Sequence, residues 1–237
     1  MHESRVQLPP GPPSSAWSQR APQYCGEVAG FTLGRPTRRV ASPARSTKRN
    51  MKKYFNKAIK ILLITNGFIL IAGAMIGPIY ALFVEKIGGD LLDASYAFAV
   101  FALAGGITTL ISGKYSDKLK ENELILVIGY GIVGVGSLSY MLVNSIWSLL
   151  LVQVIIGLGE AIYAPAFDAV YSKHLDDHHH GREWGAWEAT NYFTAAFGAI
   201  AGGILVTLFS FNAMFAIMGL LCFVNAIYIL RLPRKVL

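Results

Sequence analysis

The segment Gly113-Lys114-Tyr115-Ser116-Asp117-Lys118-Leu119-Lys120 decides how this chain folds. It is short and charged, and it separates two long apolar runs, Ala94 to Ser112 and Leu124 to Val143. A glycine lets two helix ends approach each other closely, and the lysines are typical of a connection held on the cytoplasmic side of a membrane. The pattern therefore predicts two antiparallel membrane helices joined by a cytoplasmic hairpin.

The rest of the chain repeats this alternation of long apolar runs and short polar links. The composition is 54% hydrophobic and 15% charged, far from that of an average soluble domain. A helix needs about 20 apolar residues to cross a bilayer, whereas a barrel strand needs about half as many. Because these runs have the helical length, we predict an all-α membrane fold with six transmembrane helices. The runs are Ile61–Val84, Ala94–Ser112, Leu124–Val143, Ile146–Tyr171, Trp184–Phe209 and Asn212–Leu230.

Residues 1–50 have a different character from residues 51–237. They hold eight Lys and Arg against two Asp and Glu, while the remaining chain holds thirteen against twelve. The basic charge therefore belongs to this tail, and the nearly neutral membrane domain gives no reason to expect nucleic acid as a partner. The tail is rich in Pro, Ser and Arg, which predicts disorder. It has features of an organelle transit peptide, but we expect translated upstream sequence and a natural start at Met51 of a bacterial protein.

The positions of the cations predict the orientation of the helices. Lys and Arg gather before the first run, in residues 113–120, in the link between the fourth and fifth runs, and at the C-terminus. The first link carries mostly acids, and the other two links carry no cation. Cytoplasmic loops are enriched in Lys and Arg, so both termini are predicted to face the cytoplasm of the plasma membrane.

Polar residues inside the fourth run are the candidates for a solute path. Gln153, Gly157, Glu160, Ala164 and Asp168 recur at spacings of 4, 3, 4 and 4 residues, which places them on one helical face. Glu160 lies roughly 20 Å inward from the predicted outer membrane interface, at a helical rise of 1.5 Å per residue. Such a depth lies past the middle of a hydrocarbon core about 30 Å thick.

An acid at that depth is costly and usually faces a cavity or a partner. We predict that Glu160 binds the solute or a proton, with Gln153 on the same path and Asn66 facing the same cavity from the first run. The alternative role for Glu160 is a structural hydrogen bond to a neighbouring helix. Nearer the inner interface, Asp168 and Glu188 are expected to form structural ion pairs with Arg182 or other nearby cations.

Several glycine patterns are interpreted as packing motifs. Gly129 to Gly134 matches the dinucleotide fingerprint in its letters, but no strand precedes it, so a groove for a neighbouring helix is favoured. The spacings of Gly73 to Gly77 and of Gly198 to Gly202 predict close helix contacts. Pro78 after Gly77 predicts a kink in the first helix, because proline removes a backbone donor.

The remaining reactive residues predict no chemistry. The histidines at 178–180 occupy an expected solvated loop, where adjacent side chains rarely close a metal site. Two cysteines, Cys25 and Cys222, define neither a disulfide framework nor a metal site. Because no nucleophile with a neighbouring base and no phosphate-binding loop occurs, neither an enzyme nor a cofactor or metal is predicted.

The segment at 113–120 resembles the signature loop of the major facilitator superfamily. Gly113, Asp117 and Lys118 correspond to the glycine, acid and cation of that loop. The resemblance covers residues 51–237 and implies half of a transporter, built from two inverted three-helix repeats. Gln153 stands where proton-coupled members carry an arginine, and Gly202 is followed by glycine where antiporters carry proline.

The resemblance implies a secondary transporter of a small solute that works by alternating access. Six helices are half the usual number, so we expect a homodimer around a shared site, with membrane lipid, the solute and a coupling proton or ion as partners. The alternatives are a non-transporting membrane scaffold or assembly factor, and an inactive fragment of a twelve-helix transporter.

Overall fold

The computed structural model describes residues 56–116, 122–176 and 180–232. The predicted disordered tail at 1–50 lies outside these residues. Every regular element in the described part is a helix. The elements are α1 (Lys57–Ile76), η1 (Gly77–Ile79), α2 (Tyr80–Lys86), α3 (Leu91–Ser116), α4 (Asn122–Ser139), η2 (Tyr140–Leu142), α5 (Ile146–Lys173), α6 (His180–Leu208) and α7 (Phe211–Leu230).

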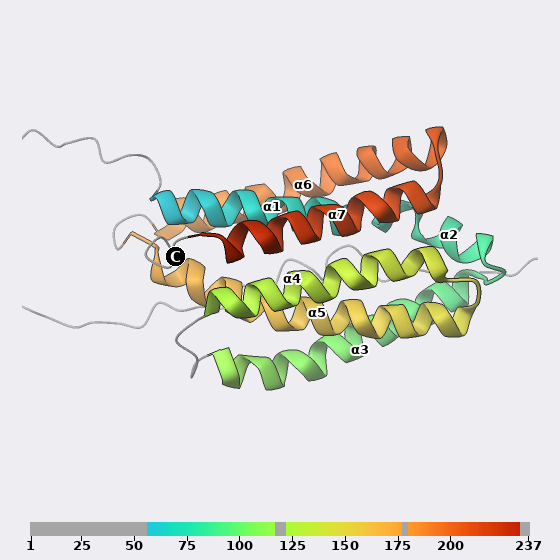
Figure 1. Ribbon diagram of the computed structural model, residues 1–237, viewed down its shortest axis with the longest axis horizontal. Helices are drawn as coiled ribbons and strands as arrows, with labels where there is room; N and C mark the ends of the chain where they lie inside the picture. Colours follow the sequence, from blue (N-terminus) through green and yellow to red (C-terminus); the bar gives the residue numbers. More distant parts are fainter. Residues whose placement is uncertain (1–55, 117–121, 177–179, 233–237) are drawn as a thin grey trace, which may run out of the picture. The chain divides into compact units, whose positions relative to one another are not determined.

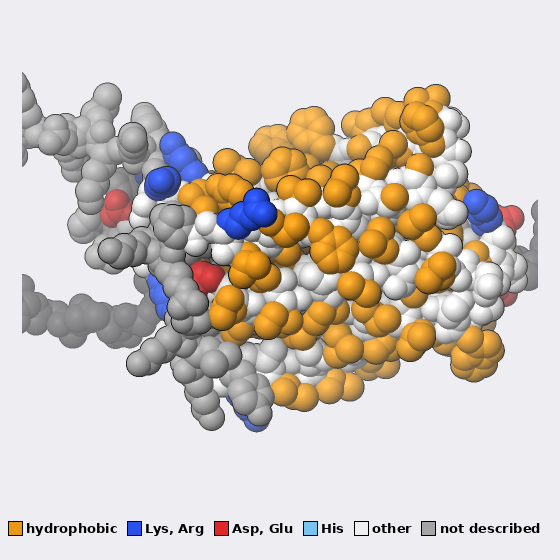
Figure 2. Space-filling view, in the orientation of Figure 1, with side chains coloured by type: hydrophobic (Ala, Val, Ile, Leu, Met, Phe, Trp, Pro, Cys, Tyr) orange, Lys and Arg blue, Asp and Glu red, His pale blue; other side chains and the backbone are white. Residues whose placement is uncertain are grey.

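The described residues contain six helical segments long and apolar enough to cross a membrane, as predicted. They run over Lys57–Lys86, Leu91–Lys114, Glu123–Leu142, Ile146–Lys173, His180–Leu208 and Phe211–Leu230. On the face seen in Figure 2, hydrophobic side chains cover the middle of the helices, while charged side chains gather toward the two ends. This distribution is that of an integral membrane protein, since lipid accepts the apolar middle and water the charged ends.

The helices form two interlocked groups of three. Consecutive spans alternate in direction (Figure 1), with α1 to α4 in the first group and α5 to α7 in the second. The middle helix of each group packs on the first helix of the other, α3 on α5 and α6 on α1. The third helices, α4 and α7, pack on each other. These exchanged contacts confirm the predicted pair of inverted three-helix repeats.

Small residues allow the exchanged helices to approach closely. A Cβ added at Gly157 of α5 would lie 2.7 Å from the Phe101 carbonyl oxygen of α3. One added at Gly202 of α6 would overlap the Met75 carbonyl of α1, and Gly198 makes a similar approach one turn earlier. The packing role predicted for the Gly198 and Gly202 pair is therefore confirmed.

The predicted groove at Gly129 to Gly134 and the following Gly136 also receive neighbouring helices. Added Cβ atoms at Gly129 and Gly136 would lie within 2.6 Å of Tyr163 and Ile156 on α5, and one at Gly134 would lie 3.1 Å from Cys222 on α7. Backbone approaches of this kind need glycine, because any side chain would hold the two helices apart. The sequence therefore belongs to helix packing and not to a nucleotide site.

The helix starts at the end opposite Lys57 are fixed by side-chain caps. Asp90 and Asp93 at the start of α3 each accept the other's backbone N–H, at 3.0 and 2.9 Å. Ser145 and Ser148 form the same reciprocal box at the start of α5. The link before α3 also contains Gly88 with φ of 86°, a conformation that glycine adopts readily. Capped links of this kind hold neighbouring helix ends in register.

Two sequence expectations are corrected by the structure. The helix of α3 continues through Gly113 to Ser116, whereas the prediction ended it at Ser112, because hydropathy marks the apolar span and not the last helical turn. Gly73 and Gly77 make no close helix contact, since a Cβ added at either would meet no heavy atom within 4 Å. At the kink predicted near Pro78, the η1 turn separates α1 from α2.

Candidate solute cavity

A cavity of about 310 Å³ lies between helices of both repeats. Tyr80 and Gly77 line it from the η1–α2 region, Phe98 from α3, and Gln153 and Glu160 from α5. Its wall is otherwise apolar and aromatic, with Ser137 as a further polar side chain. Cavities of about 300–1,000 Å³ with a few polar groups are typical of small-molecule sites.

A second cavity of about 320 Å³ adjoins the first. Gly73, Val133, Ile156 and Glu160 line both cavities, which places the Glu160 carboxylate at their junction. The second cavity extends toward α6, where Thr194 and Asn191 form part of its wall. Together the two cavities run along α5 from Gln153 past Glu160 to Tyr163.

The absence of a protein partner distinguishes Glu160 from the other polar groups of the cavity. It is the fifteenth of the 28 residues of α5, about halfway along the span, and its side chain is exposed in the isolated chain. Within residues 56–116, 122–176 and 180–232, its carboxylate makes no hydrogen bond or ion pair. The structure therefore gives no support to the alternative structural hydrogen bond. An unpaired acid at this depth requires water or a ligand in the cavity.

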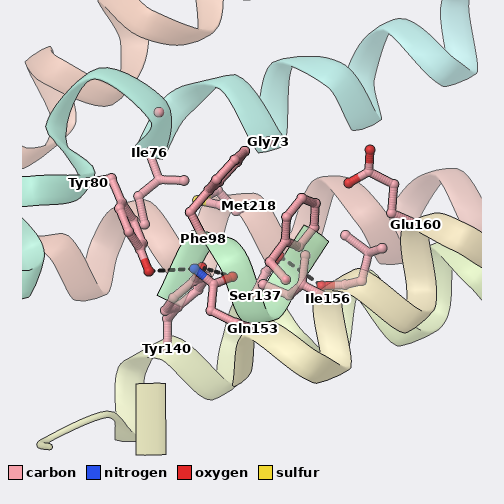
Figure 3. A pocket seen from close by; sticks show the side chains of 13 residues that line it. Gly73, Ile76, Tyr80, Phe98, Ser137, Tyr140, Gln153, Ile156, Glu160 and Met218 are labelled. Carbon is pink, nitrogen blue, oxygen red and sulfur yellow. Dashed lines mark hydrogen bonds between the residues drawn. The ribbon is translucent and has the colours of Figure 1, made fainter. Parts of the chain in front are cut away.

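Gln153 lies at the other end of the first cavity, in a small hydrogen-bonded cluster (Figure 3). Its amide nitrogen donates to the Tyr80 hydroxyl, and its amide oxygen accepts from the Tyr140 hydroxyl at 3.3 Å. Tyr140 also stacks on Phe215 of α7, with ring centroids 4.8 Å apart. The cluster joins span 1 to span 4 and so links the two repeats across the cavity.

Asn66 does not lie with Glu160 and Gln153. It is buried on α1, and its side-chain oxygen accepts a hydrogen bond from the Tyr130 hydroxyl of α4 at 3.1 Å. Neither of the two cavities is lined by Asn66. A satisfied amide between two packed helices stabilises their contact, and its predicted place on the solute path remains a prediction.

The other predicted site residues lie toward the helix ends near Lys57. Asp168 is exposed in the last turns of α5, and Arg182 and Glu188 are exposed on the first turns of α6. In the described part of the chain, neither Asp168 nor Glu188 forms an ion pair with Lys173. Gly113 lies in the last turns of α3, while Asp117 and Lys118 of the predicted signature loop lie outside the described residues.

The aromatic residues that shape the first cavity were not predicted from the sequence. Tyr80 follows the η1 break by one residue, and Tyr140 begins the η2 turn at the end of the third span. Both tyrosines place a hydroxyl on Gln153. The predicted kink at Pro78 was a usable signal, because a kink in a helix re-aims the side chains that follow it.

Glu183 is a second residue that the sequence did not reveal. Its side chain is only 2% exposed, and its carboxylate accepts the backbone N–H of Asp176 at 2.8 Å. Tyr171 donates its hydroxyl proton to the Glu183 carbonyl oxygen. The acid thus ties the end of α5 to the first turn of α6, where acidic residues commonly stabilise helix starts. Among described residues no group of three metal-ligating side chains occurs, and His178 and His179 lie outside them.

Comparison of the amino-acid sequence with known proteins shows which family and which relatives this chain is similar to. A family profile described as the Major Facilitator Superfamily matches residues 62–236. The uncharacterized MFS-type transporter YitZ of Bacillus subtilis is 24% identical over 163 residues, which are 68% of this chain and 97% of that relative. Nearly the whole of that relative therefore corresponds to the six-helix domain.

Other relatives are longer than the matched region. The multidrug resistance protein MdtG of Proteus mirabilis is 25% identical over 191 residues, 78% of this chain and 47% of the relative. The uncharacterized MFS-type transporter MJ1560 of Methanocaldococcus jannaschii is 24% identical over 171 residues, 72% of this chain and 44% of the relative. The chain spans somewhat less than half the length of these two relatives.

Proposed function

Because the chain belongs to the Major Facilitator Superfamily, we propose that it is a secondary transporter that moves a small solute across a bacterial plasma membrane by alternating access. The observation that carries this proposal is the unpaired Glu160 carboxylate at the junction of two cavities, halfway along a membrane span. In our proposal this acid holds the solute or a coupling proton. A membrane scaffold would have no need of an acid that is so costly in lipid.

The tyrosine–glutamine cluster supports a closed outer barrier. With both termini in the cytoplasm, as the cation distribution predicts, Tyr80, Gln153 and Tyr140 lie on the outer side of Glu160. Their hydrogen bonds join the segment after the η1 break to α5 of the other repeat. In this proposal, a hinge at the η1 break swings the α2 segment away from α5, breaks these bonds and admits the solute from outside.

We further propose that two copies assemble around a shared central site. Of the most apolar 18-residue stretches of the spans, only 11% is buried in α3 and 17% in α6, against 39–44% in the other four. These two helices also contribute Phe98 and Thr194 to the cavity walls. A second copy placed against α3 and α6 would enclose the cavities. The match to nearly all of YitZ supports a working unit assembled from chains of this size.

Solute flux in liposomes tests the proposed function. Ligand-induced shifts in the melting temperature of the purified full chain, measured across amines, sugars, amino acids and drugs, would select solutes for flux measurements. Wild-type protein should carry a selected solute, and Glu160→Gln should lower flux at least tenfold with an unchanged melting temperature. Glu188→Gln, which alters an exposed acid outside both cavities, serves as the matched control. Flux that is equal in the wild type and Glu160→Gln would remove Glu160 from the mechanism.

A further inference from the structure

The charge of the cavity walls defines the chemical class of the solute. Among the described residues that line the two cavities, Glu160 is the sole charged side chain, and Lys, Arg and His are absent. An anionic solute would have to enter this low-dielectric site beside a carboxylate without a compensating cation, which is strongly unfavourable. A neutral solute would leave an ionised Glu160 without a counter-charge, so it fits this site only when a proton neutralises the carboxylate.

Aromatic rings line both of the cavities that Glu160 borders. Phe98 and Phe101 of α3 lie with ring centroids 5.9 Å apart and line the first cavity. Tyr163 lines the second cavity one turn beyond Glu160 on α5. The faces of aromatic rings attract cations, more strongly when water is excluded. The acid and the rings therefore favour the same kind of ligand.

From this arrangement we propose that the solute is an organic cation whose positive centre pairs with Glu160. Its apolar body packs against Phe98, Phe101 and Ile156, and a polar end can reach Gln153 in the outer half of the first cavity. Figure 3 shows this separation, with Glu160 at one end of the cavity and the cluster of Gln153, Tyr80 and Tyr140 at the other. The proposal rests on the proposed transport function for its biological meaning, but binding is measurable without transport.

The volumes limit the size of such a cation. Each cavity holds about 310–320 Å³, and the two share the wall formed by Gly73, Val133 and Ile156. A ligand of drug size would occupy both cavities and place its charge at their junction, where Glu160 lies. Hydrophilic polyols have few partners in these walls, which are mainly apolar.

A pair of probes with nearly the same shape and opposite charge tests the proposal. Binding of tetraphenylphosphonium and of tetraphenylborate would be measured on the purified full chain in detergent by scintillation proximity or calorimetry. We expect the wild type to bind the phosphonium at least tenfold more tightly than Glu160→Gln does. Glu188→Gln should bind it like the wild type, and Glu160→Asp should retain an intermediate affinity. The borate should show no binding that depends on Glu160.

A second measurement covers the case in which Glu160→Gln does not fold. In the wild-type protein, phosphonium should protect Glu160 from modification by dicyclohexylcarbodiimide, as read by mass spectrometry, and borate should give no protection.

Equal phosphonium binding by the wild type and a folded Glu160→Gln variant, or equal protection by both probes, would overturn the cation proposal. Flux of a neutral or anionic solute would overturn the cation class and leave transport intact. Phosphonium binding that depends on Glu160 in a protein without any flux would support the cation site and count against transport.

Discussion

Gly73 and Glu160 line the same two cavities from the first helices of the two repeats, α1 and α5. They lie 87 residues apart in the sequence. The same interval relates Asn66 to Gln153 and Pro78 to Pro165. Gly73 and Glu160 therefore hold corresponding sequence positions in the two repeats and border the same cavities, where Glu160 supplies the charge and Gly73 leaves open space.

The open space beside Gly73 predicts a variant that blocks the cavity without unfolding the protein. A Cβ added at Gly73 meets no heavy atom within 4 Å, so Gly73→Leu should fold and project its side chain into both cavities. We expect solute flux or phosphonium binding to fall at least tenfold, with the melting temperature changed by a few degrees at most. Binding assays and thermal unfolding of the same preparation would measure the two effects.

Gly203→Leu is the matched control for the blocked cavity. Gly203 also has open space around its added Cβ, but it lies on α6 outside both cavities. The control should retain binding at the wild-type level. Equal loss of binding in both variants would indicate a general effect of leucine on these helices, and retention of binding by Gly73→Leu would remove Gly73 from the cavity wall.

The exchanged packing of α6 on α1 predicts that two neighbouring glycines of α6 differ strongly in how far an added methyl group destabilises the protein. A methyl group at Gly202 would overlap the Met75 carbonyl, whereas one at Gly203 meets nothing within 4 Å. Overpacking of this kind costs about 1–3 kcal/mol. We therefore expect Gly202→Ala to lower the melting temperature in detergent by several degrees and Gly203→Ala to leave it nearly unchanged. Similar melting temperatures for the two variants would contradict the close contact of α6 with α1.

Hydropathy and charge predicted much of the fold, because a bilayer imposes span length and helical structure on the chain. They also placed Glu160 in the middle of a span, since an acid stands out in an apolar run. The cavity walls were harder to predict. Gly73 lines the cavity while Gly202 packs against a carbonyl, although both belong to GxxxG patterns. A spacing alone does not reveal which face of a helix meets another helix and which faces a cavity.

The hydrogen-bond partner of Gln153 could not be predicted from the sequence for a related reason. Tyr80 and Gln153 are 73 residues apart and meet only because the first membrane span of each repeat borders the same cavity. Asn66 shows the converse case, since a polar residue at the equivalent position of α1 is buried against Tyr130. Polar residues within spans can stabilise helix contacts or line cavities, and tertiary packing decides between these roles.

The hydrogen bond between Gln153 and Tyr80 predicts a leakier outer barrier when it is removed. Tyr80→Phe deletes one hydroxyl, and a neutral hydrogen bond contributes about 0.5–1.5 kcal/mol, or roughly two- to tenfold in an equilibrium. In a background with Cys25→Ser and Cys222→Ser, Gly73→Cys provides a thiol at the cavity wall. Its labelling by an impermeant maleimide from outside should rise by that factor in Tyr80→Phe.

Tyr228→Phe is the control for the barrier experiment. This tyrosine lies on α7, is 47% exposed, and lines neither cavity. The control should label at the rate of the parent protein. Faster labelling of Tyr80→Phe from the cytoplasmic side alone would contradict the proposed placement of the cluster on the outer side of Glu160.

The proposed homodimer predicts specific cross-links between α3 and α6 of different copies. Leu103 on α3 and Phe193 on α6 each lie near the middle of their helices and are 66% and 64% exposed. In the cysteine-free background, Leu103→Cys with Phe193→Cys should yield an intermolecular dimer with a bifunctional maleimide in native membranes. Leu220→Cys, at mid-height on α7 and 61% exposed, should cross-link at least tenfold less.

Equal yields would indicate random collision in the bilayer, and monomer alone with a flux-competent protein would show that one copy is sufficient. Capture of a different membrane chain by the α3 and α6 cysteines would instead assign these two helices to a separately encoded second half.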